Sequence, residues 1–159
     1  MPSLEETIGR LLLAKDLTLG TVESATGGLI AARLIDVPGS SDYFKGAIVS
    51  YSNEVKMRAV GVRKETLDEQ GAVSAPVAEQ MAAGGRRVLR VDICLSDTGI
   101  AGPGGATPGK PVGLFYIGLA DMDGASARRH VFQGTRAENR RAAVEAGLAW
   151  LKSYLEGLT

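Results

Sequence analysis

Residues 17–28 read Leu-Thr-Leu-Gly-Thr-Val-Glu-Ser-Ala-Thr-Gly-Gly, and within them a strand pattern changes into a helix start. The part up to Glu23 is rich in Thr, Leu and Val, which favours a strand. Gly27 and Gly28 precede an apolar stretch, 29–37, which predicts a helix that ends before Pro38-Gly39. A strand that leads directly into a helix is the repeating unit of an α/β fold.

Helix signals recur on both sides of this stretch. Two capping boxes, Ser3 with Glu6 and Thr135 with Glu138, predict a helix over 4–15 and a long final helix. Further helices are expected after an N-cap at Ser52, over 66–70, and from Pro76 to about 89.

Strand patterns alternate with these helices, at 46–51, 91–96, 112–120 and 127–132. The stretch 112–120 is nearly all apolar, which is typical of a strand buried on both faces, as in a parallel sheet. Asp123-Gly124 predicts a hairpin turn before the last strand. We therefore predict an α/β fold, a three-layer α/β/α sandwich with a mixed, mostly parallel sheet of about five strands, as a single domain over 1–159.

The charge balance argues against a nucleic-acid partner. The chain has 159 residues, 18 Lys and Arg against 18 Asp and Glu, and aromatic residues make up only 5%. Proteins that bind nucleic acid usually carry a basic surplus or a set of stacking aromatic rings. We therefore expect no nucleic acid as a partner, and an RNA-binding domain is the least favoured class.

The numbers of cysteine and histidine residues and the length of the apolar runs exclude several further kinds of protein. Cys94 is the only cysteine, so an internal disulfide is excluded, and His130 is the only histidine, which argues against a His-based metal site or a Ser-His-Asp triad. No apolar run approaches the roughly 18 residues of a membrane span, and the acidic N-terminus does not resemble a signal peptide. We expect a cytoplasmic protein with no membrane partner and no metal.

Ser24 is the first candidate for catalysis. It lies at the carboxyl end of the first predicted strand and just before a helix, where α/β proteins bind ligands. The N–H groups of Thr26, Gly27 and Gly28 could stabilise an oxyanion or hold a phosphate. The alternative is that Ser24 and Thr26 are simple helix caps and the glycines only permit close packing, and the spacing alone slightly favours this alternative.

Lys56 is the candidate base for this serine. It follows the second strand in Tyr51-Ser52-Asn53-Glu54-Val55-Lys56, and neighbouring parallel strands would place it beside Ser24. A lysine whose pKa is lowered by desolvation can accept the serine proton, and Tyr51 could relay or orient that proton. The alternative is a solvated lysine on a surface helix.

A loop rich in glycine and proline, 98–111, is the third candidate. Its spacing from Gly104 to Lys110 nearly matches a P-loop, but Pro111 replaces the required Ser or Thr and a strand follows, so a P-loop is rejected. With Thr98 and Gly99 at its start, the loop suits the wall of a ligand site. An irregular crossover is the other interpretation.

Arg136 and Arg140 share one face at the start of the final helix, where cations oppose the helix dipole. An anionic ligand there would explain them, and a solvated helix end is the alternative. Ser41, in Pro38-Gly39-Ser40-Ser41, could add a hydroxyl donor or simply form a turn.

Several of these segments together resemble the carboxy-terminal domain of the competence/damage-inducible CinA family, called PncC when it stands alone. The similarity covers most of the chain, with one visible departure at Ala25, where the family often has Cys. The matching segments are Val22-Glu23-Ser24-Ala25-Thr26-Gly27-Gly28, Pro38-Gly39-Ser40-Ser41, Tyr51-Ser52-Asn53-Glu54-Val55-Lys56, Gly71-Ala72-Val73-Ser74, Thr98-Gly99-Ile100-Ala101-Gly102-Pro103-Gly104-Gly105, Lys110-Pro111-Val112-Gly113 and Gly134-x-Arg136.

The resemblance implies a nicotinamide-nucleotide amidohydrolase that needs no cofactor. Ser24 would be the nucleophile, activated by Lys56 with Tyr51 nearby, and Ser41, Thr98 and the region of Arg136 and Arg140 would bind the substrate. The partner would be a small-molecule nucleotide, in the recycling of pyridine nucleotides. A non-catalytic nucleotide-binding module is the alternative, and the oligomeric state is open, with a homo-oligomer allowed.

Overall fold

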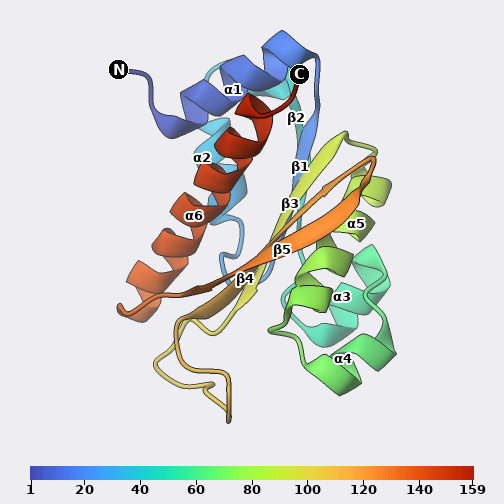
Figure 1. Ribbon diagram of the computed structural model, residues 1–159, viewed down its shortest axis with the longest axis vertical. Helices are drawn as coiled ribbons and strands as arrows, with labels where there is room; N and C mark the ends of the chain where they lie inside the picture. The colour runs from blue at the N-terminus through green and yellow to red at the C-terminus, as the bar shows by residue number, and fades with distance from the viewer.

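The computed structural model describes residues 1–159 as a mixed sheet covered by helices on both faces (Figure 1). In chain order the elements are α1 (Leu4–Lys15), β1 (Leu19–Glu23), α2 (Leu29–Ile35), the 3₁₀ turn η1 (Ser40–Asp42), β2 (Phe44–Val49), α3 (Asn53–Val60), α4 (Lys64–Gln70), α5 (Ala75–Leu89), β3 (Ile93–Gly99), β4 (Leu114–Asp121), β5 (Gly124–Val131) and α6 (Arg136–Glu156). The three layers that the sequence predicts are present.

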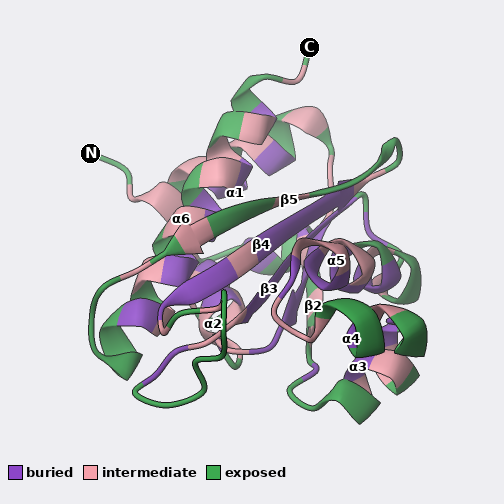
Figure 2. Cartoon of the chain, turned by 60° about the horizontal axis from the view of Figure 1, so that its bottom comes forward, coloured by how far each residue is buried: buried purple, intermediate pink, exposed green.

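The sheet divides the apolar interior into two parts. Helices α1, α2 and α6 cover one face, and α3, α4 and α5 cover the other (Figure 1). The larger core includes Leu19 and Leu95 from strands with Leu34 and Leu148 from helices. The smaller core joins Val22 and Cys94 of the sheet to apolar residues of α3, α4 and α5. Figure 2 shows buried strands at the centre and the exposed β5 at one edge.

The prediction of a mostly parallel sheet is wrong. The strand order is β2-β1-β3-β4-β5, in which β1 pairs with β2 and β3 in parallel, whereas β4 pairs with β3 and β5 antiparallel. The segment 100–113 between β3 and β4 contains no helix, and a parallel connection would normally need a helical crossover. The apolar run in β4 has another cause: α5 and α6 contact opposite faces of this antiparallel strand.

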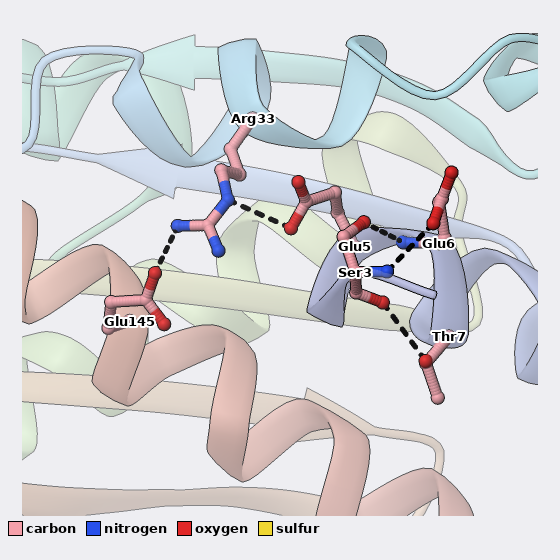
Figure 3. A network of polar contacts seen from close by, with 6 residues as sticks. All are labelled: Ser3, Glu5, Glu6, Thr7, Arg33 and Glu145. Carbon is pink, nitrogen blue, oxygen red and sulfur yellow. Dashed lines mark hydrogen bonds and ion pairs between the residues drawn. The ribbon is translucent and has the colours of Figure 1, made fainter. Parts of the chain in front are cut away.

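The predicted capping boxes at Ser3 and Thr135 are present, and ion pairs beside the first one connect three helices. The Ser3 hydroxyl accepts from the N–H of Glu6 at 3.2 Å, and Glu6 accepts from the N–H of Ser3 at 2.7 Å (Figure 3). Glu5, in the same turn, pairs at 2.9 Å with Arg33 of α2, which also pairs with Glu145 of α6. The three helices on this face are therefore tied together by one arginine.

The parallel part of the sheet brings the carboxyl ends of β1, β2 and β3 to one edge. The turn after β1, the start of α3 and the loop after β3 all leave from this edge. Helices α3 and α5 pack closely against each other on one face of the sheet. Gly84 of α5 lies against the carbonyl oxygen of Val60 in α3, and a Cβ at this glycine would come within 1.8 Å of that oxygen. None of the helices combines the length and apolar character needed to span a membrane.

Candidate active site

A pocket of about 230 Å³ opens at the carboxyl edge of the sheet. Its walls come from the turn after β1, the start of α3, the loop between α4 and α5, the end of β3 and the start of α6. The residues that line it are Ser24, Ala25, Tyr51, Asn53, Lys56, Ala72, Val73, Thr98, Gly99, Ala101 and Arg136. Segments that are far apart in the sequence therefore meet around one small space.

Ser24 and Lys56 form a hydrogen-bonded pair in this pocket. Lys56 Nζ lies 3.1 Å from Ser24 Oγ, and it also donates to the carbonyl oxygen of Tyr51 at 2.7 Å. The lysine is 1% exposed and the serine 7% exposed. Ser52 fixes the start of α3 as its N-cap, which sets the position of Lys56 one turn later. The two residues expected to meet at this edge therefore do so.

The environment of Lys56 makes its neutral form more accessible than that of an ordinary lysine. Burial lowers the pKa of Lys56 from 10.5 to about 8, although the negative charge of Asp97 acts in the opposite direction. No carboxylate forms a salt bridge with the amine. A neutral amine has a lone pair, so at this position Lys56 can accept the proton of the Ser24 hydroxyl.

The turn that carries Ser24 rests on Asp97, which the sequence analysis missed. The Asp97 carboxyl accepts from the N–H of Thr26 at 3.1 Å and from the N–H of Ser24 at 3.3 Å, and it contacts the Thr26 hydroxyl. Burial raises the pKa of Asp97 to about 6. A single acidic residue near the end of an otherwise uncharged buried strand was the signal that could have identified it.

The N–H groups expected to hold an oxyanion are engaged elsewhere. Thr26 donates to Asp97, Gly27 donates to the carbonyl oxygen of Ser24 at 3.1 Å, and Gly28 donates to Glu23 at 3.0 Å. These bonds shape the turn, so the structure places Thr26, Gly27 and Gly28 as its framework. The N–H of Ala25 forms no hydrogen bond within the protein, and Ala25 lines the pocket.

The two arginines of α6 have different positions. Arg140 is turned toward the Ser24 turn, where it donates to the carbonyl oxygens of Ala25 at 2.9 Å and Thr26 at 3.1 Å. It does not line the pocket. Arg136 does line the pocket, and one of its N–H groups is held by the carbonyl oxygen of Gly102 at 2.9 Å.

The loop after β3 forms one wall, as expected of Thr98 and Gly99. Thr98 is buried, and its hydroxyl donates to the carbonyl oxygen of Ala72 at 2.8 Å, which joins β3 to the loop before α5. Asn139 of α6 is a second residue that the sequence analysis missed. Its amide donates to the carbonyl oxygens of Ala101 and Gly134 and accepts from the N–H of Gly134. These bonds hold the loop against α6.

Ser41 lies away from the pocket, so the structure does not bring it together with the other candidate residues. It belongs to η1, directly before β2, and β2 runs parallel to β1, so η1 lies at the edge where both strands begin. Ser24 lies at the opposite edge. Tyr51 does reach the pocket, but its contact with Lys56 is through the backbone carbonyl, and the residue is 64% exposed at the rim.

Fold and site together define an α/β protein with a serine–lysine pair in a pocket at the carboxyl edge of its sheet. A sequence model of the CinA C-terminal domain matches residues 1–155. The chain therefore belongs to the CinA C-terminal domain family.

Curated relatives agree with this assignment. A CinA-like protein of Sulfurihydrogenibium sp. is 46% identical over 152 residues, which cover 96% of this chain and 38% of the relative. A CinA-like protein of Chlorobium limicola is 48% identical over 97% of this chain and 37% of its own length. The chain therefore spans less than two fifths of the length of these relatives.

Solved structures match over nearly the whole fold. A CinA superfamily protein from Klebsiella pneumoniae has a TM-score of 0.94 at 30% identity, over 98% of this chain and 97% of that chain. The competence/damage-inducible protein CihA from Agrobacterium tumefaciens has a TM-score of 0.85 at 36% identity, over 98% of both chains.

Proposed function

We propose that this protein is a nicotinamide mononucleotide deamidase, which hydrolyses the carboxamide to nicotinate mononucleotide and ammonia. The observation that carries the proposal is the 3.1 Å contact between Ser24 Oγ and Lys56 Nζ, in a pocket that also exposes a guanidinium. The CinA C-terminal domain family includes nicotinamide mononucleotide deamidases. The activity is proposed for this chain, which corresponds to part of its longer relatives.

The first half of the reaction forms an ester with the enzyme. Ser24 Oγ attacks the carboxamide carbon while Lys56 Nζ accepts the hydroxyl proton. The tetrahedral intermediate collapses when its C–N bond breaks, and Lys56 gives the proton to the leaving nitrogen, which departs as ammonia. The nicotinoyl group then remains on Ser24 as an acyl-enzyme, and Lys56 is neutral again.

The second half consumes water. A water molecule attacks the ester carbonyl while Lys56 accepts its proton, and the bond to Ser24 Oγ breaks as Lys56 returns the proton to that oxygen. Nicotinate mononucleotide leaves and the site returns to its starting state. Both the nucleophile and the base come from the chain itself.

The N–H of Ala25 is the donor best suited to the oxyanion. It follows the nucleophile directly, it lies on the pocket wall, and no group of the protein uses it. Backbone N–H groups in this position stabilise tetrahedral intermediates in other serine hydrolases. The Arg140 contact with the carbonyl oxygen of Ala25 holds the next peptide of the turn in place.

Arg136 is the candidate for the substrate phosphate. Its side chain reaches the pocket, and the bond to Gly102 occupies only part of its five N–H donors. At the rim, the exposed ring of Tyr51 offers an aromatic surface to the cationic pyridinium ring. The pocket thus presents complementary groups to both ends of the nucleotide.

Ammonia release from nicotinamide mononucleotide tests the proposal. We expect activity in the wild-type protein and a loss of at least about 1,000-fold in Ser24→Ala and Lys56→Ala, in line with other serine hydrolases that lose a nucleophile or its base. Ser126→Ala and Lys64→Ala, at exposed positions on β5 and α4, are the matched controls and should keep full activity. Activity retained in Ser24→Ala would overturn the nucleophile. Nucleotide binding without turnover in the wild type would favour a binding module instead.

A further inference from the structure

Thr26 Oγ1 lies between two buried carboxyl groups. It is 2.7 Å from Glu23 Oε1, and it also contacts Asp97 Oδ2 at hydrogen-bond distance. Glu23, Thr26 and Asp97 are all fully buried. A hydrogen-bonded chain therefore runs from the end of β1 to β3, directly beneath the turn that carries Ser24.

Each of these two contacts needs a hydrogen atom, and the threonine hydroxyl has only one. If Thr26 donates to one carboxyl, its oxygen must accept from the other, and that second carboxyl must be protonated. Two ionised carboxylates would leave one pair of oxygen atoms in close contact with no proton between them. The chain of contacts therefore contains one carboxylic acid and one carboxylate.

The other hydrogen bonds identify Glu23 as the carboxylate. Its two oxygens accept from the N–H groups of Gly28, Ile30 and Ala31 at 2.9–3.0 Å and from the Thr21 hydroxyl at 3.0 Å, and these N–H groups belong to the start of α2. Donors at a helix start stabilise negative charge. Asp97 accepts only two N–H groups, one of them at 3.3 Å.

We propose that Asp97 is a neutral carboxylic acid in the assembled site, donating its proton to Thr26 Oγ1, and that it serves there as a positioning residue that keeps Lys56 free to act as a base. Its Oδ1 and Oδ2 still accept from the N–H groups of Thr26 and Ser24, so the turn is held without a negative charge beneath it. Its role toward Lys56 rests on the proposed function, whereas its protonation does not.

A neutral Asp97 suits the chemistry above it. An ionised carboxylate would stabilise the ammonium form of Lys56 and would repel the negative charge that develops on Ser24 during attack. A negative charge on Asp97 raises the pKa of Lys56 and so makes the amine a less available base. Neutral Asp97 removes both effects and leaves the hydrogen bonds to the turn intact.

The charged groups around Asp97 act in both directions. Glu23 on β1 disfavours a negative charge on Asp97. Lys56 on α3 favours such a charge, and so does Arg140 on α6, which binds the same turn. The residue that pairs with Asp97 on β4 is the apolar Ile117. Burial is the largest influence and raises the pKa of Asp97 to about 6. The hydrogen bonds that the N–H groups of Thr26 and Ser24 donate to Asp97 lower this pKa, whereas a hydrogen bond donated by the acid form to Thr26 Oγ1 raises it.

Carbon-13 NMR of the aspartate carboxyl groups tests the protonation directly, with or without enzyme activity. The resonance that disappears in Asp97→Asn identifies Asp97, and the exposed Asp68 provides an internal reference. Asp97 must stay protonated at the pH where Lys56 becomes neutral, so we expect its titration midpoint to lie above about pH 8, compared with the ordinary aspartate value of 3.8. A midpoint below about pH 8 would overturn the proposal.

The pH profile of ammonia release tests the role toward Lys56. Asp97→Asn keeps a neutral group that accepts from the N–H of Thr26 and donates to Thr26 Oγ1, so we expect the rise of kcat/KM with pH to keep its midpoint within about 0.3 pH units. The value of kcat should fall, because the amide nitrogen cannot accept from the N–H of Ser24. If Asp97 is ionised while Lys56 acts, removing its charge will move the midpoint to lower pH by about one unit or more. Asp68→Asn, which removes an exposed charge on α4, is the control.

Discussion

Arg140 Nε donates a hydrogen bond of 2.9 Å to the carbonyl oxygen of Ala25, across 115 positions of sequence. The same guanidinium reaches the carbonyl oxygen of Thr26 at 3.1 Å. The carbonyl oxygens that follow Ser24 are therefore held from α6, while Asp97 holds the N–H groups of Ser24 and Thr26 from β3. The nucleophile turn is fixed from two elements that are distant in the chain.

Loss of Arg140 should therefore impair the chemical step more than substrate binding. In Arg140→Gln we expect kcat to fall by about 10- to 100-fold, because a small displacement of the reacting oxygen is enough for such a loss. KM should change little. Arg141→Gln, an exposed neighbour on the same helix, is the control. A raised KM at unchanged kcat would instead indicate that Arg140 contacts the substrate.

Arg136 should show the opposite behaviour. Its guanidinium lines the pocket, so Arg136→Gln removes a charge-assisted contact to the phosphate, which is usually worth about 1.5–3 kcal/mol. We expect the dissociation constant of the mononucleotide, measured by calorimetry in Ser24→Ala protein, to rise by about 10- to 100-fold. Arg129→Gln on the exposed strand β5 should bind as before. Unchanged affinity would show that the phosphate lies elsewhere.

The pKa of Lys56 predicts the pH dependence of the rate. Only the neutral amine accepts a proton, so kcat/KM should increase with pH and level off above about pH 8, well below the ordinary lysine value of 10.5. Lys56→Arg should be inactive throughout, because a guanidinium stays protonated. A rate that continues to rise to pH 10 would show an ordinary, solvated lysine. Ammonia release measured from pH 6 to 10 distinguishes the two cases.

Gly84 should be essential for packing. A Cβ at this position would come within 1.8 Å of the Val60 carbonyl oxygen, so α3 and α5 would have to separate. We expect Gly84→Ala to lower the free energy of unfolding by about 1–3 kcal/mol, as overpacking typically does. Activity should fall as well, since α3 carries Lys56.

The matched control for this change is Gly104→Ala. No atom lies within 4 Å of a Cβ at Gly104, so its stability should be unchanged or slightly increased. Urea unfolding of both variants measures the difference. Equal stability of the two would mean that α3 and α5 adjust without cost.

Local signals in the sequence were sufficient for much of the fold. The capping boxes at Ser3 and Thr135 place the starts of α1 and α6 correctly, because a cap depends on neighbours within a few positions. Strand direction depends on distant partners. The apolar run of β4 indicates burial on two faces, and burial alone does not distinguish a parallel strand from an antiparallel one covered by helices on both sides.

The same distinction applies to the site. Ser24 and Lys56 could be paired from the sequence because each follows a strand, and β1 and β2 proved to be parallel neighbours. Ser41 precedes its strand and so lies at the other edge. The bond from the N–H of Thr26 to Asp97 could not be deduced from the sequence, because Asp97 comes near this turn only when β1 and β3 pair.

The bonds from Arg140 have a consequence for how the protein matures. Strands β1 and β2 and helix α3 all precede α6 in the chain, so the Ser24 turn lacks its bonds from Arg140 until residue 140 has been made and α6 has docked. A nascent chain would therefore hold its reactive alcohol in a loose loop. Competence for turnover would arrive late, in a single step, with the docking of one helix.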